Sequence, residues 1–193
     1  MSTTTPASTG SPAAAPAPAV STWTIDPAHT EAGFSVKHLM ISTVRGRFGE
    51  VAGTIRLDED DLSRSSVEVE LDAATIDTRS EQRDTHLRSA DFFAVEDHPR
   101  ITFRSREVVP AGDGFTVIGV LAIRGVTREV VLDVTDEGRG GDPWGGQRAA
   151  FSATTAIDRR DFGLTWNQGL EAGGVMVGHE VRITLDVQAV KAD

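Results

Sequence analysis

Strict alternation of apolar and polar residues is the feature that most constrains how this chain can fold. In "EVRITLDVQAV" (180–190), every second residue from Val181 to Ala189 is apolar, and the residues between them are charged or polar. The same period of two occurs in "SVEVELDA" (66–73), "EVVLDV" (129–134) and "EVAGTIRLD" (50–58). Successive side chains of a strand point to opposite faces, so this pattern predicts antiparallel strands with one buried face and one face in water.

Further strands are predicted at 23–26, 31–38, 100–109, 115–124 and 147–157, separated by turn signals such as "AGDG" (111–114), "RGVT" (124–127) and "GRGGDPWGG" (138–146). The "RGVT" stretch is predicted to be a tight hairpin turn with Gly at a special dihedral position. No strand–helix–strand spacing interrupts the series, which indicates an all-β fold, either a barrel or a sandwich. Many of the predicted strands are long, which favours a tilted antiparallel β-barrel of about eight strands, while a sandwich is the alternative. Glycines within strands, Gly53 and Gly119, fit bends or a close approach by something inside the barrel.

Two stretches depart from the strand pattern. The segment 78–93 predicts a short helix over about 79–89 on the connection between two strands. A capping box of Thr78 and Glu81 and an i,i+4 pair of Asp84 and Arg88 support that helix. The stretch "DRRDFGL" (158–164) predicts a turn or short helical piece that closes one end of the barrel.

Composition and the N-terminal stretch restrict partners and location. The net charge of −10 disfavours nucleic acid, and the absence of Cys removes disulfides and thiol nucleophiles. Residues 1–21 are interpreted as a disordered Pro/Ala/Ser/Thr-rich tail and 22–193 as one domain. No Lys or Arg precedes Lys37, so no basic segment typical of a secretory signal is present, and we expect a cytoplasmic protein.

Catalytic and metal-binding signals are weak. The five histidines form neither H-x-H nor H-E-x-x-H, and no G-x-S-x-G motif occurs, so we predict no metal, no cofactor and no catalytic residue. His38 is interpreted either as a hydrogen-bonded histidine at a barrel rim or as a polar contact at the mouth of an apolar cavity. The aromatic residues fit either a filled core or the lining of a tunnel, and periodicity alone does not decide between them.

Several long motifs resemble one family. They are "WTIDPAHTEAGFSVKHLMISTVRGRFGEVAGTI", "RDTHLRSADFF", "VIGVLAIRGVTREVVLDV", "FSATTAIDRRDFGLTW" and "VGHEVRITLDVQAV". In this order, from Trp23 to Val190, the chain resembles the YceI-like family of polyisoprenoid- and lipid-binding proteins. The resemblance implies a lipocalin-like antiparallel β-barrel that holds a long isoprenoid, a quinone or another amphiphilic chain. Many members are periplasmic and made with a signal peptide, and this chain departs from them in its N-terminal stretch.

The resulting hypothesis is non-catalytic binding, sequestration or transport of a polyisoprenoid, quinone or fatty-acid-like amphiphile. The predicted tunnel lining is Phe34, Val36, Phe48, Ile55, Leu71, Phe103, Leu121, Ile123, Phe151, Phe162 and Trp166. The predicted head-group contacts or lid are His38, Arg79, Arg83, Asp84, His86, Phe92 and Phe93. Within "RDTHLRSADFF" (83–93), Leu87, Phe92 and Phe93 would close one end of the barrel, and Arg83 and Asp84 would fix the loop by hydrogen bonds.

Two other functions stay open from the sequence. One is a barrel isomerase or hydrolase that acts on an apolar substrate, with Asp84 and His86, or His38, as acid and base. The other is a filled barrel that serves as a protein-interaction module. A homodimer is also left open, because the sequence carries no signal for an interface.

Overall fold

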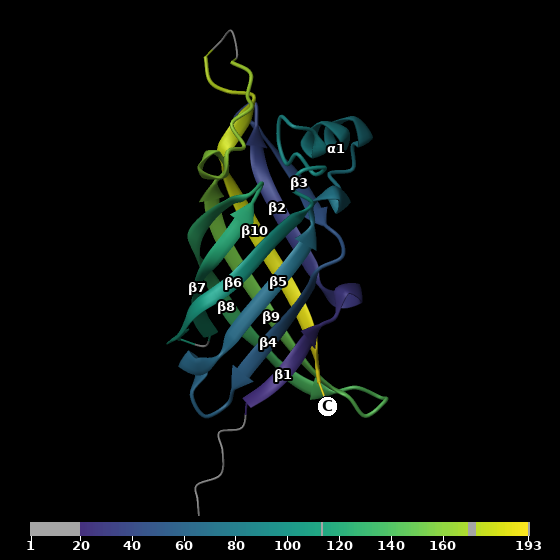
Figure 1. The fold of residues 1–193 in the computed structure, drawn as a ribbon, viewed down its shortest axis with the longest axis vertical. Coiled ribbons are helices and arrows are strands. Elements are labelled where there is room, and N and C mark those ends of the chain that lie inside the picture. Colours follow the sequence, from purple (N-terminus) through teal and green to yellow (C-terminus); the bar gives the residue numbers. More distant parts are fainter. Residues whose placement is uncertain (1–19, 113, 170–172, 193) are drawn as a thin grey trace, which may run out of the picture.

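The chain folds into a closed antiparallel β-barrel with one α-helix at one end (Figure 1). The computed structural model describes residues 20–112, 114–169 and 173–192. The strands are β1 (Val20–Ile25), β2 (Glu31–His38), β3 (Ser42–Phe48), β4 (Ala52–Asp58), β5 (Ser66–Asp72), β6 (Arg100–Ala111), β7 (Gly114–Ile123), β8 (Val126–Gly141), β9 (Gln147–Asp158) and β10 (Val177–Lys191). The helices are α1 (Glu81–Arg88) and four short 3₁₀ helices, η1 (Pro27–His29), η2 (Leu62–Arg64), η3 (Ala73–Thr75) and η4 (Arg159–Phe162).

Two interrupted strands reduce the ten strands to eight positions around the barrel. Strand β10 pairs with β2 along one part of its length and with β1 along another, so β1 and β2 share one position. Strand β1 pairs with β4 and β2 pairs with β3, so β3 and β4 share the next position. Strands β5 to β10 fill the other six positions, and the β1–β10 pairing closes the ring. The predicted antiparallel barrel of about eight strands is therefore confirmed.

Most strands begin and end near the boundaries predicted from the alternation, and the differences concern β3 and the start of β1. Strand β3 was not among the predicted strands, because Gly46 interrupts its apolar face. A Cβ at Gly46 would lie only 2.4 Å from the Phe34 ring, so the glycine makes room for that aromatic side chain. Strand β1 begins at Val20, so Val20 and Ser21 belong to the barrel; the rest of the predicted tail lies outside the described residues.

The hairpin at 124–125 forms as predicted. Ile123 and Val126 pair across a two-residue turn in which Arg124 and Gly125 have φ values of 51° and 73°. Positive φ at both central residues is typical of two-residue hairpin turns whose twist matches that of the flanking strands. Gly adopts a positive φ without a steric cost.

Helix α1 lies within the predicted range, but its stabilising contacts differ from those predicted. The capping box does not form: Ser80 is the N-cap residue, and the Thr78 hydroxyl donates to Asp84 Oδ1 at 2.5 Å. Arg88 donates to the carbonyl oxygens of Ala74 and Ile76, and Asp84 is occupied by Thr78, so the predicted Asp84–Arg88 pair is wrong. Buried hydrogen-bond partners thus took precedence over neighbours along the helix. Helix η4 confirms the short helical piece predicted at 158–164.

The two ends of the barrel are packed differently. At the end away from α1, which we call the far end, Trp23, Leu57, Phe151 and Ala189 form one buried cluster. At the end beside α1, which we call the helix end, Phe92, Phe162 and Leu164 belong to a second cluster with residues of β6, β7 and β8.

A carboxylate near the β1–β10 junction gives a pH-dependent contribution to stability. Asp26 Oδ2 accepts from Arg148 Nη1 at 2.8 Å, and hydrogen bonds from Arg148 and then His29 lower the pKa of Asp26 to about 2. Because the folded pKa lies below that of the unfolded chain, this stabilisation is present above about pH 3.9 and is lost as pH falls toward 2. We expect Asp26→Asn to lower the melting temperature at pH 7, and to show a smaller further loss between pH 4 and pH 2 than the unmodified chain. Asp133→Asn, on the outer face of β8, is the control, and equal acid sensitivity of all three proteins would contradict this role for Asp26.

Candidate ligand cavity

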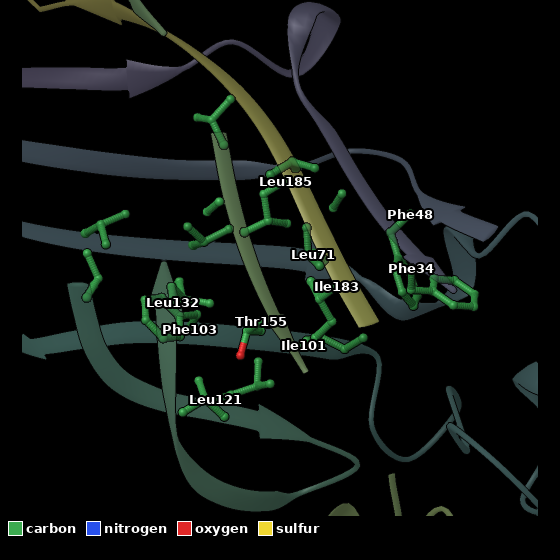
Figure 2. A pocket seen from close by; sticks show the side chains of 18 of the residues that line it. Phe34, Phe48, Leu71, Ile101, Phe103, Leu121, Leu132, Thr155, Ile183 and Leu185 are labelled. Carbon is green, nitrogen blue, oxygen red and sulfur yellow. The ribbon is translucent and has the colours of Figure 1, made fainter. Parts of the chain in front are cut away.

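The barrel encloses an apolar cavity. The volume of the cavity is about 280 Å³, and its wall is formed almost entirely by aliphatic and aromatic side chains. Figure 2 shows that these side chains converge from several strands, among them Leu71, Ile101, Leu121, Leu132 and Ile183. An eight-stranded barrel has room either for a filled core or for one small ligand, and this barrel is hollow.

Small residues at inward positions explain why the interior is not filled. On β9, the inward side chains between Phe151 and Ile157 are only Ala153 and Thr155. On β7, Gly119 faces inward, and a Cβ there would lie 2.5 Å from the Phe103 ring. The ring therefore lies against the wall over Gly119, which leaves space along the barrel axis.

Most of the predicted tunnel-lining residues lie on the cavity wall. They are Phe34, Val36, Phe48, Ile55, Leu71, Phe103, Leu121, Ile123 and Phe151. Alternation predicts that they lie on the inward face, and the pairing registers of β2, β3, β4, β5, β6, β7 and β9 agree with this. Contact of these side chains with a ligand stays a prediction.

Phe162 and Trp166 are exceptions, because they pack behind the wall. Phe162 is 1% exposed and belongs to the cluster at the helix end. The Trp166 ring lies 5.4 Å from the Phe92 ring and 4.7 Å from that of His86. The chain leaves the period of two at η4, so alternation could not place these residues; they support the helix end from outside the cavity.

The predicted plug residues Leu87, Phe92 and Phe93 line the cavity at the helix end. The Phe93 ring meets the Phe48 ring edge-on at 5.7 Å, and Phe48 lies 5.6 Å from Phe34. These aromatic contacts connect the segment after α1 to β2 and β3. We call Leu87, Phe92 and Phe93 the apolar plug.

Hydrogen bonds hold the segment that carries the plug. Buried Asp84 Oδ1 accepts from the backbone N–H and the hydroxyl of Thr78. Arg83 Nε donates to the Thr78 hydroxyl at 2.7 Å, and Arg83 Nη2 donates to the Thr78 carbonyl at 2.8 Å. These bonds fix the start of α1, as the sequence predicted for Arg83 and Asp84.

The predicted polar head-group residues are not on the cavity wall. His38, Arg79, Arg83, Asp84 and His86 are all absent from the lining. His38 lies at the end of β2, where its carbonyl accepts from Ser42, and His86 Nε2 lies 2.8 Å from Asp91 Oδ2. The Arg79 backbone N–H donates to Asp77. These side chains belong to the outer surface or to the support of α1.

Arg159 is a cavity residue that the sequence-based prediction missed. It is 3% exposed and lines the cavity at the helix end, where burial lowers the pKa of its guanidinium. A signal for it existed: the inward series Phe151, Ala153, Thr155 and Ile157 continues in steps of two to position 159. The motif "DRRDFGL" was predicted to be a turn or short helical piece that closes one end of the barrel, and the continuation of the inward series into it was not predicted.

Two other features bear on the chemistry of the site. Within residues 20–112, 114–169 and 173–192, no group of three or more His, Cys, Asp or Glu residues is arranged to hold a metal ion. In the same ranges, no helix has the length and hydropathy needed to cross a membrane.

Comparison with known proteins places this barrel in a family. The model of the YceI-like domain matches residues 23–189. A UPF0312 protein of Serratia proteamaculans is 38% identical over 164 residues, which cover 85% of this chain and 82% of that protein.

Solved structures share the fold at lower identity. The BcnA protein of Burkholderia cenocepacia superposes with a TM-score of 0.75 at 22% identity and covers 85% of this chain and 98% of its own. A polyisoprenoid binding domain from Saccharophagus degradans superposes with a TM-score of 0.60 at 14% identity, over 90% of this chain and 98% of its own. Together, the domain match over almost the whole barrel and the Serratia relative show that this chain belongs to the YceI-like family.

Proposed function

We propose that this protein binds the hydrocarbon chain of an isoprenoid-type or other long-chain amphiphile inside its barrel, without catalysing a reaction on it. The observation that carries the proposal is the cavity inside the barrel, whose wall is apolar along strands from both halves of the chain. The hollow interior distinguishes this barrel from one with a filled core, and its apolar wall provides the environment that a hydrocarbon chain prefers over water.

The family supports the same class of ligand. The Saccharophagus domain is described as polyisoprenoid binding, and it shares the barrel with this chain. Polyisoprenoids and the side chains of quinones consist of repeated branched hydrocarbon units, which match a lining of branched aliphatic and aromatic residues.

Burial of the chain supplies the binding free energy. Each buried CH₂ group contributes about 0.8 kcal/mol, so about ten methylene groups offset the cost of association without any specific polar contact. Selection among ligands therefore depends on the length and shape of the cavity and on its few polar groups.

The positions of the acid–base candidates support binding without catalysis. Asp84, His86 and His38 lie off the cavity wall, and the Asp84 carboxylate is occupied by Thr78. A general acid or base must reach the reacting group within hydrogen-bond distance. A chain held in this cavity would not meet any of the three side chains.

Purification from the native host tests the proposal. The expected result is that organic extraction followed by mass spectrometry finds one class of long-chain amphiphile with the protein. After the lipid is removed, the protein is expected to take up a polyprenol in native mass spectrometry as one adduct per chain. Extracts without any such lipid, together with no uptake of a polyprenol, a quinone or a fatty acid, would refute the proposed function.

The proposal includes three more specific statements. The protein is located in the cytoplasm, it forms a homodimer, and it binds the lipid in order to sequester or transport it. Cell fractionation tests the first and sedimentation tests the second. Transfer of a labelled lipid between vesicles distinguishes transport from sequestration, because a carrier accelerates transfer whereas a store does not.

A further inference from the structure

Arg159 is an unusual residue on an otherwise apolar wall. Among the described residues that line the cavity, Glu31 and Arg159 are the charged ones, and Glu31 is exposed to solvent. Arg159 is the buried member of this pair, at the position where β9 passes into η4. Its place in the cavity is not explained by the binding of hydrocarbon.

The guanidinium is held in place by backbone carbonyl groups. Nε donates to Gly178 at 2.8 Å, and Nη1 donates to Leu164 and, at 2.9 Å, to Trp166. Nη2 donates to Val177 at 3.3 Å. A guanidinium carries five N–H groups, and these four bonds leave one N–H of Nη2 without an acceptor among the described residues.

The positive charge is only partly offset by a neighbouring carboxylate: the charge of Asp158 favours the charged guanidinium, but burial has the larger effect and lowers the pKa of Arg159. Within the described residues, Arg159 forms no ion pair, and adjacent Asp158 is bound to Arg160 at 2.5 Å. Carbonyl dipoles solvate a buried cation, but they do not cancel its charge. In a low-dielectric cavity, a charge without a direct ion-pair partner is costly and attracts an anion.

We infer that Arg159 binds the polar end of the ligand, and that this end is anionic, a carboxylate or a phosphate. The inference rests on the proposed function, because it assigns the head group of the same bound chain. The hydrocarbon part would extend from Arg159 along β9 toward Phe151. These two cavity residues are eight positions apart, which corresponds to about 26 Å of strand.

The geometry favours an anion over a neutral hydroxyl. The remaining N–H of Nη2 can donate one hydrogen bond to either group, but with an anion both the donor and the acceptor are charged, which strengthens the bond. An anion also removes the net charge of the site, which a hydroxyl cannot do. Carboxylate and phosphate share this chemistry, so both belong in the test.

The first experiment needs no substitution. Isothermal titration of the delipidated full chain compares oleate with oleyl alcohol, and farnesyl phosphate with farnesol. In each pair we expect the anion to bind at least about tenfold more tightly. Preference for oleate alone or for farnesyl phosphate alone identifies which anion the site accepts. Equal affinity within both pairs, or tighter binding of both alcohols, would overturn the inference.

Substitutions then locate the effect. Arg159→Gln is expected to remove the preference for the anion, so that the anion and the alcohol of each pair bind with similar affinity, whereas Arg159→Lys retains part of the preference. Arg182→Gln removes the same charge from the exposed face of β10 and is the matched control. If Arg182→Gln reduced the preference as much as Arg159→Gln, the preference would come from the overall charge of the protein, and the inference would be wrong.

Folding and function are separated in the design. Arg159 supports the backbone carbonyl groups of Leu164, Trp166, Val177 and Gly178, so a melting curve accompanies each titration. If Arg159→Gln does not fold, the titrations of the unmodified chain decide the question. Failure of all four amphiphiles to bind the unmodified chain would refute the proposed function itself. Binding of the alcohols without a preference for anions would refute only the role of Arg159.

Discussion

Replacing Ala153 with Phe is expected to weaken binding of a long polyprenol by at least about a hundredfold while the barrel stays folded. Ala153 lies on the cavity wall at the centre of β9, between the inward side chains of Phe151 and Thr155. The added ring places six carbon atoms where the ligand chain would lie. Each methylene group that it displaces removes about 0.8 kcal/mol of binding free energy.

Ala156→Phe is the matched control for this substitution. It introduces the same side chain on the same strand, but Ala156 is exposed on the outer face of the barrel. We expect its affinity for the polyprenol to equal that of the unmodified chain. If both substitutions leave binding unchanged, the ligand does not occupy this part of the cavity.

Replacing Asp84 with Ala is expected to have the largest effect on stability. Asp84 is 5% exposed and accepts two hydrogen bonds from Thr78, which in turn holds Arg83. Its removal leaves buried donors without an acceptor and costs about 2–4 kcal/mol. For a domain of this size, this corresponds to a decrease in melting temperature of about 5–10 °C.

Asp91→Ala is the control for the loss of a carboxylate in the same segment. Asp91 contacts His86 at 2.8 Å, but its side chain is 53% exposed, so this surface pair contributes little. A decrease for Asp84→Ala no larger than that for Asp91→Ala would contradict the structural role. An unchanged melting temperature with lost ligand uptake would instead assign Asp84 to binding.

The sequence predicted the barrel well because period-two alternation has one physical cause. A strand between a hydrophobic interior and water must alternate, and pairing in register places all inward residues on one surface. For this reason, residues as far apart as Phe34, Leu121 and Phe151 were correctly expected to face inward. Whether the interior is hollow could not be predicted, because that depends on summed side-chain volumes at positions such as Gly119 and Ala153.

Residues outside regular strands were predicted less well. Thr78 and Glu81 have the spacing of a capping box, but the Thr78 hydroxyl donates to buried Asp84. The spacing of residues along the sequence does not reveal this contact. Arg159 was overlooked because it follows the last residue of β9, where its own motif indicated a turn. The head-group candidates were selected for charge near the barrel end, whereas the cavity holds its buried charge at the end of a strand.

Methyl NMR reports directly on whether a hydrocarbon chain lies inside the barrel. Strand β8 offers an internal comparison, since Val130 and Leu132 face the cavity and Val131, between them, is 48% exposed on the outside. On addition of a polyprenol, we expect shifts of the Val130 and Leu132 methyl resonances, nuclear Overhauser contacts from both residues to the lipid, and unchanged Val131 resonances. Lipid contacts confined to Val131 and other outer methyl groups, with Val130 and Leu132 unaffected, would show that the lipid does not enter the barrel.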